Sequence, residues 1–145
     1  MSNYLVLLLV ALLGGIAVVI QAQFTGIMDK AMGTLESIFM TYVIGGIAIA
    51  LIVLLYRGGN LYTWRTVPWY ALLSGIFGLV IIGSLSFAVP RLGLIVTFTI
   101  FVATQFVLGA IFDHFGLFGA EIRPFTTQKL IGTLILLFGV WLIIR

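Results

Sequence analysis

A stripe of polar and small residues runs along one side of a long apolar segment. Gln105, Gly109 and Asp113 follow Phe101 at intervals of four, so they share one side of a helix, and Thr97 extends the stripe. Gln105 lies near the middle of the segment, where its amide needs hydrogen-bond partners that hydrocarbon cannot supply. It must therefore bond another helix, water or a ligand.

A second polar pair lies near the end of the first apolar segment, where Gln21 and Thr25 are one helical turn apart. Two glutamine-bearing helices can line one cavity, or their amides can bond each other and hold the helices together. We favour the cavity, because Gly109 leaves room beside Gln105. Both interpretations remain open at this point.

Glu36 stands at the start of the second apolar segment. The helix dipole favours a carboxylate there, which would give it a purely structural role. Ionisable groups in membranes also commonly face a cavity, so Glu36 could instead bind a cation or exchange a proton. We take Glu36 as the candidate for coupling, and Tyr42 in the same segment as a candidate lining residue.

Asp113 and His114 close the fourth apolar segment. A carboxylate at a helix C-terminus is opposed by the dipole, so it requires a partner, and Arg123 across a short loop is the obvious one. His114 could accept or relay a proton. The alternative, which we favour for His114, is a loop held by an Asp113–Arg123 ion pair, in which the three residues are structural.

Several classes of chemistry are not expected. The chain has no cysteine and one histidine, so thiol chemistry, thiolate sites and histidine-based zinc sites are excluded. We recognise no phosphate-binding glycine loop and no paired nucleophile and base, and we expect neither an enzyme nor a bound cofactor or metal. The seven basic residues are scattered, whereas a nucleic-acid-binding protein needs a basic face.

The elements that must position these residues are membrane-spanning helices. Of 145 residues, 63% are hydrophobic and only 8% are charged, too few to cover a soluble protein of this size. Residues 47–56 are apolar on every face, which excludes the alternation of a β-barrel strand. The sequence predicts an all-α integral membrane protein, residues 1–145 forming one transmembrane domain. Its five predicted spans are about 4–25, 37–56, 68–89, 92–112 and 128–144.

The connections add detail to this prediction. The first span lacks a basic leader and a good cleavage site, so we expect it to be retained. Residues 90–93, Pro-Arg-Leu-Gly, permit only a tight turn, which makes spans three and four antiparallel neighbours. Glycines offer surfaces for close helix packing. These are Gly14–Gly15, Gly45–Gly46, Gly78 with Ser74, and Gly132 with Gly139.

The charges hardly specify an orientation in the membrane. Five spans place the termini on opposite sides, with four basic residues on the N-terminal side and three on the other. The first group is Arg57, Arg65, Arg123 and Lys129, and the second is Lys30, Arg91 and Arg145. A difference of one basic residue is compatible with a protein that inserts in one direction with the help of folding or of a partner. It is equally compatible with a protein that inserts in both directions and pairs with an inverted copy of itself.

With these residues in view, the sequence resembles the YdcZ-type family of bacterial inner-membrane exporters in the drug/metabolite transporter superfamily. The matching pieces are Pro68-Trp69, Ser74–Gly78, Val89–Gly93, Gln105, Ile111–Gly119, Arg123-Pro124 and Gly132, with Gln21 and Tyr42–Gly45 in the first half. The family pattern often has asparagine where this chain has Thr25. The resemblance implies half-size transporters that assemble as antiparallel homodimers, or as heterodimers of oppositely oriented paralogues.

Together these features predict a multi-pass protein of the bacterial inner membrane that moves a small organic solute by alternating access. We expect it to act as an inverted, ten-helix dimer with its site near the midplane. The expected lining residues are Gln21, Thr25, Glu36, Tyr42, Thr97 and Gln105. A channel, or a non-transporting assembly or regulatory subunit, remains an alternative.

Overall fold

The computed structural model describes residues 2–56, 59–119, 121–124 and 126–145, and these residues form helices and turns without a strand. Five of the helices are long and apolar enough to cross a membrane, which confirms the all-helical, five-span prediction. Those five are α1 (Ser2–Met32), α2 (Thr34–Leu55), α3 (Ser74–Leu92), α4 (Leu94–Phe115) and α5 (Thr127–Ile144). Short 3-10 helices η1 (Leu61–Thr66), η2 (Trp69–Leu73) and η3 (Leu117–Gly119) lie between them.

Several helix boundaries differ from the predicted ones, and the structure explains three of the differences. Helix α1 continues to Met32 and stops only where Gly33 adopts a φ of +99°. The third span begins as the 3-10 helix η2, with Pro68 at its N-cap, and becomes a regular α-helix at Ser74. Pro90 lies inside α3, so Gly93 alone separates α3 from α4.

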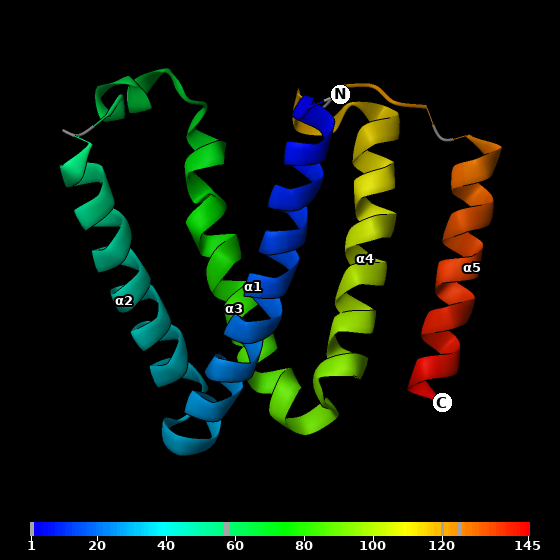
Figure 1. The fold of residues 1–145 in the computed structure, drawn as a ribbon, viewed down its shortest axis with the longest axis horizontal. Coiled ribbons are helices and arrows are strands. Elements are labelled where there is room, and N and C mark those ends of the chain that lie inside the picture. The colour runs from blue at the N-terminus through cyan, green and yellow to red at the C-terminus, as the bar shows by residue number, and fades with distance from the viewer. Residues whose placement is uncertain (1, 57–58, 120, 125) are drawn as a thin grey trace. The chain divides into compact units, whose positions relative to one another are not determined.

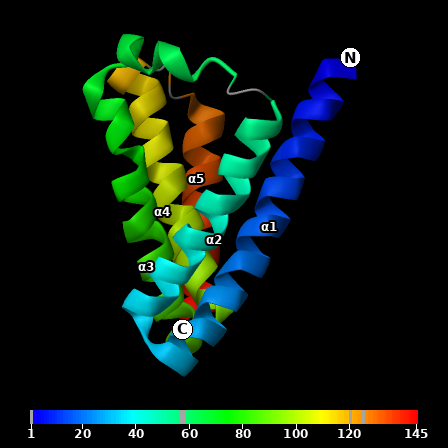
Figure 2. The ribbon, with the colours of Figure 1, turned by 90° about the vertical axis from the view of Figure 1, so that its left-hand side faces the viewer.

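The chain divides into two compact units, Met1–Arg91 and Leu92–Arg145, and each is described by itself. In the first, α1 and α2 form an antiparallel hairpin around Gly33. Helix α3 joins them near that turn, and the N-terminal part of α1 diverges from both, as Figures 1 and 2 show. The buried positions of this unit lie near the convergent end. They are Ala22, Thr25, Gly26, Asp29, Ser37, Ile82, Leu85, Ser86 and Val89.

In the second unit, α4 packs against α5, and η3 follows α4 in the connection between them. Helix α4 ends at Gly116, which adopts the left-handed conformation common at helix C-termini. Helix α5 begins after Thr126, whose hydroxyl accepts a hydrogen bond from the backbone N–H of Lys129. The prediction of one transmembrane domain stays a prediction.

The spacing of buried residues repeats along the chain. Buried positions 22, 25, 26 and 29 of α1 are followed sixty residues later by buried positions 82, 85, 86 and 89 of α3. The turns keep the same offset, because Gly33 (φ 99°, ψ 164°) corresponds to Gly93 (φ 82°, ψ 162°). Ser37 and Thr97, each four residues after its glycine, are both buried. The two helix–glycine–helix segments are therefore built on one plan.

Most large apolar side chains point outward. Every residue from Tyr4 to Gln21 on α1 is exposed, although this stretch is almost wholly apolar. A surface of this kind is compatible with lipid or with another chain, and not with water. Helix α1 has 31 residues, a length of about 46 Å against a hydrocarbon core of about 30 Å, so it must tilt or extend beyond the core.

Candidate functional site

A buried hydrogen-bonded cluster ties α1, α2 and α3 together, and the carbonyl oxygen of Thr25 is its centre. This oxygen accepts hydrogen bonds from the hydroxyls of Ser37, at 3.0 Å, and Ser86, at 3.1 Å. The Ser86 hydroxyl also lies 3.0 Å from that of Ser37. Each serine is fully buried, so the cluster joins three helices where water cannot compete.

The hydroxyl of Thr25 is used within its own helix, where it donates to the carbonyl of Ala22 at 3.1 Å. Thr25 is only 1% exposed and sits between helices. The arrangement gives this residue a packing role in the described structure. Its predicted part in lining a cavity remains a prediction.

An ion pair extends the cluster toward the Gly33 turn. The Arg91 guanidinium donates to the Asp29 carboxylate at 3.0 Å, and the Thr34 hydroxyl donates to the other carboxylate oxygen. Arg91 also donates to the carbonyl of Phe87 at 2.6 Å. The sequence analysis did not single out Asp29, Ser37 or Ser86. The sequence contained a signal for this ion pair, since the acidic Asp29 precedes the turn at Gly33 and the basic Arg91 precedes the corresponding turn at Gly93.

Glu36 lies in the first turn of α2, as predicted from the sequence. Its side chain folds back over Gly33, since one carboxylate oxygen lies 2.8 Å from the point that a Cβ on Gly33 would occupy. The residue is exposed, and its carboxylate has no hydrogen-bond or ion-pair partner among the residues that the structure describes. Glu36 is therefore accessible to a ligand, although it lies at a helix end.

Tyr42 packs across the α2–α3 interface. Its hydroxyl approaches Gly78 so closely that a Cβ there would collide with it, and Ile38 approaches Gly83 in the same way. The sequence analysis expected Gly78 to serve close packing, and the structure gives it that use. Many other glycines have no atom within 4 Å of the point that a Cβ would occupy. Among them are Gly14, Gly45, Gly132 and Gly139, which the sequence analysis expected to serve close packing.

The polar stripe of α4 borders a pocket of about 450 Å³ in the second unit. Gln105, Phe106, Gly109 and Asp113 contribute from α4, Arg123 from the connection and Lys129 from the first turn of α5. Gln105 is exposed, and its amide has no hydrogen-bond partner among the described residues. Gln105, Gly109 and Asp113 of the predicted stripe thus line this pocket. Gln21 is exposed on α1 of the first unit, and a cavity shared by Gln21 and Gln105 stays a prediction.

Thr97 lies on the same helix but differs from Gln105 in its surroundings. Its side chain is 1% exposed, and its hydroxyl oxygen is buried without a hydrogen-bond partner in the described part of the chain. A buried hydroxyl of this kind is costly unless a water molecule or a ligand satisfies it. Its predicted role in binding stays a prediction.

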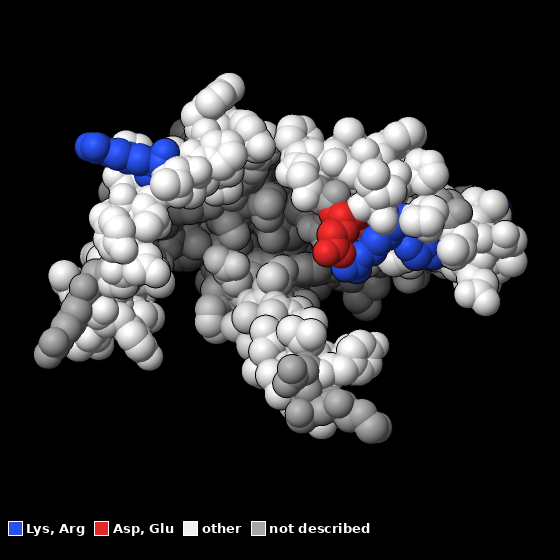
Figure 3. Space-filling view, turned by 90° about the horizontal axis from the view of Figure 1, so that it is seen from above, with Lys and Arg blue, Asp and Glu red and all other residues white. Residues whose placement is uncertain are grey.

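Arg123 pairs differently from the sequence-based expectation. Its guanidinium donates a hydrogen bond to the Glu121 carboxylate at 3.0 Å. Its hydrogen bond with Asp113 is formed by the backbone, where the Arg123 N–H donates to the Asp113 carbonyl oxygen at 2.8 Å. The hydrogen bond and charge of Glu121, with the charge of Asp113, raise the pKa of Arg123. Glu121 is only two residues from Arg123 in the chain, so the two side chains can pair locally. On the face drawn in Figure 3, acidic and basic side chains lie side by side at one place, and a basic side chain lies apart from them. Arg57 lies outside the described residues.

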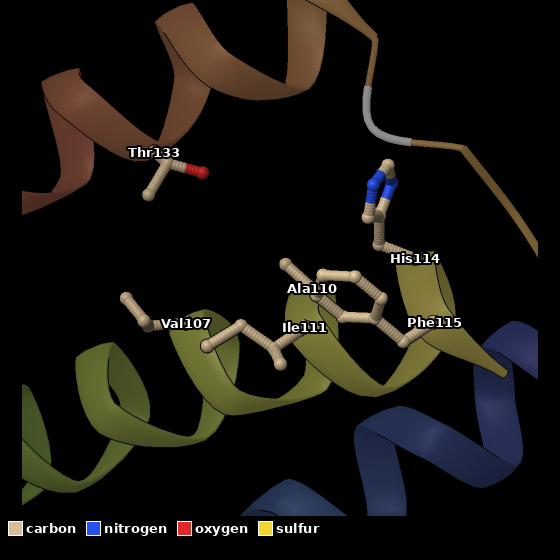
Figure 4. Close-up of a pocket in the computed structure, with 6 residues that line it drawn as sticks. All are labelled: Val107, Ala110, Ile111, His114, Phe115 and Thr133. Carbon is tan, nitrogen blue, oxygen red and sulfur yellow. The ribbon is translucent and has the colours of Figure 1, made fainter. Parts of the chain in front are cut away.

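His114 borders a second, apolar pocket of about 390 Å³ (Figure 4). Val107, Ile111 and Phe115 of α4 face Thr133 of α5 across this space. The Thr133 hydroxyl donates to the carbonyl of Lys129 at 2.8 Å, and the ring of His114 packs edge-on against Phe115. These surroundings are mainly apolar, and the structural role favoured for His114 stays a prediction.

The described side chains of these sites offer hydrogen-bonding and charged groups. Among the described residues, no group of three or more histidine and acidic residues could hold a metal ion. The sequence of the chain matches, over residues 6–142, the family described as "putative inner membrane exporter, YdcZ". The chain belongs to this family. No curated protein and no solved structure matches it.

Membership of the YdcZ family confirms the predicted resemblance and the location. The protein is a multi-pass protein of the inner membrane, in a family of membrane exporters that is not an enzyme class. The match spans both units, so the α1–α3 cluster and the pocket of α4 and α5 lie within it. A membrane exporter implies a lipid setting and a small-molecule substrate.

Proposed function

We propose that this chain is one half of an inverted dimer that exports a small organic solute by alternating access. The observation that carries the proposal is the state of Gln105. It lies in the middle of α4, is exposed, and has no hydrogen-bond partner among the described residues. Hydrocarbon cannot satisfy an amide at that depth, so a second chain, water or a solute must do so.

Two further features support a second, inverted copy. The basic residues differ by only one between the two sides of the membrane, so insertion in either direction is nearly balanced. The glycines at 14, 45, 132 and 139 leave space for the close approach of a helix that the described chain does not supply. An odd number of spans in an inverted pair reproduces the inverted-repeat plan of many transporters.

Labelling of single cysteines tests the orientation. The chain has no cysteine, and residues 60 and 145 are expected on opposite sides of the membrane. Asn60→Cys and Arg145→Cys would be expressed separately and treated in intact cells with a membrane-impermeant maleimide. Both sites should be labelled to a comparable extent. Labelling of one site alone, with the other labelled only after lysis, would contradict dual topology.

Glu36 is proposed to bind a cation or to couple transport to protons. Glu36→Gln keeps the size of the side chain and removes its charge, so it should abolish solute-dependent proton flux in proteoliposomes loaded with a pH-sensitive dye. Lys30→Gln, which removes a charge at an exposed position of α1, is the control and should keep the flux. Unchanged flux in Glu36→Gln would remove this role.

The same vesicles separate the alternatives. A carrier should show saturable, slow flux, because each solute requires a conformational cycle. A channel should instead give unitary conductance in planar bilayers, and a non-transporting subunit should give no solute-dependent flux. For a non-transporting subunit, a ligand-dependent change in the fluorescence of Trp69 and the other tryptophans would distinguish a chain that binds ligand from one that does not.

A further inference from the structure

The pocket of the second unit combines apolar walls with an unequal set of charges. Lys129 and Arg123 contribute two cations to its lining, and Asp113, half-buried, contributes one carboxylate. Phe106 and the adjoining small residues form the apolar wall. A volume of about 450 Å³ is within the range of pockets that hold small organic molecules.

The two cations are not in equivalent situations. Arg123 is already paired with Glu121, whose side chain is 83% exposed and does not line the pocket. Lys129 has no carboxylate partner among the residues that the structure describes. It also lies three residues after the capping Thr126, where a glutamate is typical and the helix dipole disfavours a cation. Lys129 is thus the cation of the lining that forms no ion pair with a described carboxylate, and Asp113 is the acidic group of the same lining.

Gln105 supplies a neutral hydrogen-bonding group to the same space. Its amide can both donate and accept, and no described residue uses it. A ligand that reaches from Lys129 toward Gln105 would therefore meet a cation, an apolar wall and an amide.

We infer that this pocket binds the anionic group, a carboxylate or phosphate, of an amphipathic molecule, with Lys129 as its main counter-charge. Arg123 adds to the positive field, Phe106 contacts the apolar part and Gln105 bonds a polar group. The inference rests on the proposed function, because Gln105 is also a predicted lining residue of the transport path. The anionic group can belong to a soluble solute or to a lipid headgroup, and the test separates these sources.

Binding of simple probes to the full chain tests the inference. The protein would be placed in nanodiscs of phosphatidylcholine and titrated with hexyl phosphate, hexanoate and hexylamine, with binding followed by ligand-observed NMR. We expect the two anions to bind and hexylamine not to compete. Lys129→Gln should weaken anion binding about tenfold, and Lys129→Arg should largely retain it. Lys30→Gln, a change at an exposed lysine of α1, is the matched control and should have no effect.

A second arm identifies the source of the anionic group. Native mass spectrometry would compare retention of phosphatidylglycerol by the wild-type chain and Lys129→Gln. Retention that depends on Lys129 assigns the pocket to a lipid headgroup, and binding of hexyl phosphate alone assigns it to a soluble solute. The inference is overturned if neither anion nor phosphatidylglycerol depends on Lys129, or if hexylamine binds as well as hexanoate.

These measurements need no transport, so the inference and the proposed function can fail separately. Lys129-dependent binding without solute flux would retain the pocket and reject the transporter. Flux through an inverted dimer that is unchanged in Lys129→Gln, together with absent anion binding, would retain the transporter and reject the pocket.

Discussion

The Arg91 guanidinium lies 3.0 Å from the Asp29 carboxylate and joins the last turn of α3 to the end of α1. The Asp29 side chain is 5% exposed and that of Arg91 48% exposed, so the carboxylate depends on its partners far more than the guanidinium does. Thr34 holds the other carboxylate oxygen, which brings the start of α2 into the same contact. One carboxylate therefore fixes three helices at one end of the first unit.

Removing the cation should destabilise this end of the protein. Arg91→Gln leaves the Asp29 carboxylate buried without its counter-charge, and we expect a loss of about 2 kcal/mol in the free energy of unfolding. Asp29→Asn combined with Arg91→Gln should cost less than the sum of the single changes. Reversible unfolding in mixed micelles measures both. Lys30→Gln, beside the pair but exposed, is the control, and an equal loss there would contradict the assignment.

The serine cluster should contribute a smaller, cooperative stabilisation. Ser86→Ala removes the hydrogen bonds to the Thr25 carbonyl and to Ser37, and interhelical hydrogen bonds in membranes contribute about 0.6 kcal/mol on average. We expect a loss near that size, and a non-additive effect with Ser37→Ala. The same unfolding assay applies. Ser84→Ala changes an exposed serine of the same helix, and the prediction fails if it costs as much.

The closeness of Tyr42 to Gly78 predicts a mutation and its rescue. A Cβ at residue 78 would collide with the Tyr42 hydroxyl, so Gly78→Ala should separate α2 from α3 at a cost of about 1–3 kcal/mol. Adding Tyr42→Phe removes the colliding oxygen and should recover part of the loss. Gly75→Ala, where a Cβ has open space, should be neutral or slightly stabilising. Absence of rescue would mean that the contact does not limit helix packing.

The five spans and the polar stripe of α4 were predictable from sequence, because both depend on local composition and spacing. The segment around Gln105 shows this, since positions four apart must share a face of any helix. The cluster of Ser37 and Ser86 was not predictable in the same way. These residues are 49 positions apart in the chain, and only the packing of α2 on α3 brings them together.

Two expectations show where local reasoning stops. The dipole argument predicted that Arg123 would pair with the Asp113 carboxylate, but the guanidinium pairs with Glu121, which is nearer in sequence. The first span is predicted to end near residue 25, whereas helix α1 continues to Met32. Tertiary contacts account for the difference, since Thr25 and Asp29 are buried against α2 and α3.

The two glycine turns allow backbone strain to be separated from an effect on Glu36. Gly33 and Gly93 share a conformation, with φ of 99° and 82°, that costs a residue with a Cβ about 1–3 kcal/mol. Gly93→Ala has open space around its Cβ, so its unfolding should report the strain alone. Gly33→Ala carries the same strain and also displaces the Glu36 carboxylate. Both variants should therefore lose similar stability, but only Gly33→Ala should alter solute-dependent proton flux.

Gly15→Ala, in the exposed part of α1, is the control for a helical glycine and should change neither measurement appreciably. Equal flux in Gly33→Ala and Gly93→Ala, measured at matched amounts of folded protein, would mean that the position of Glu36 over Gly33 does not matter for coupling.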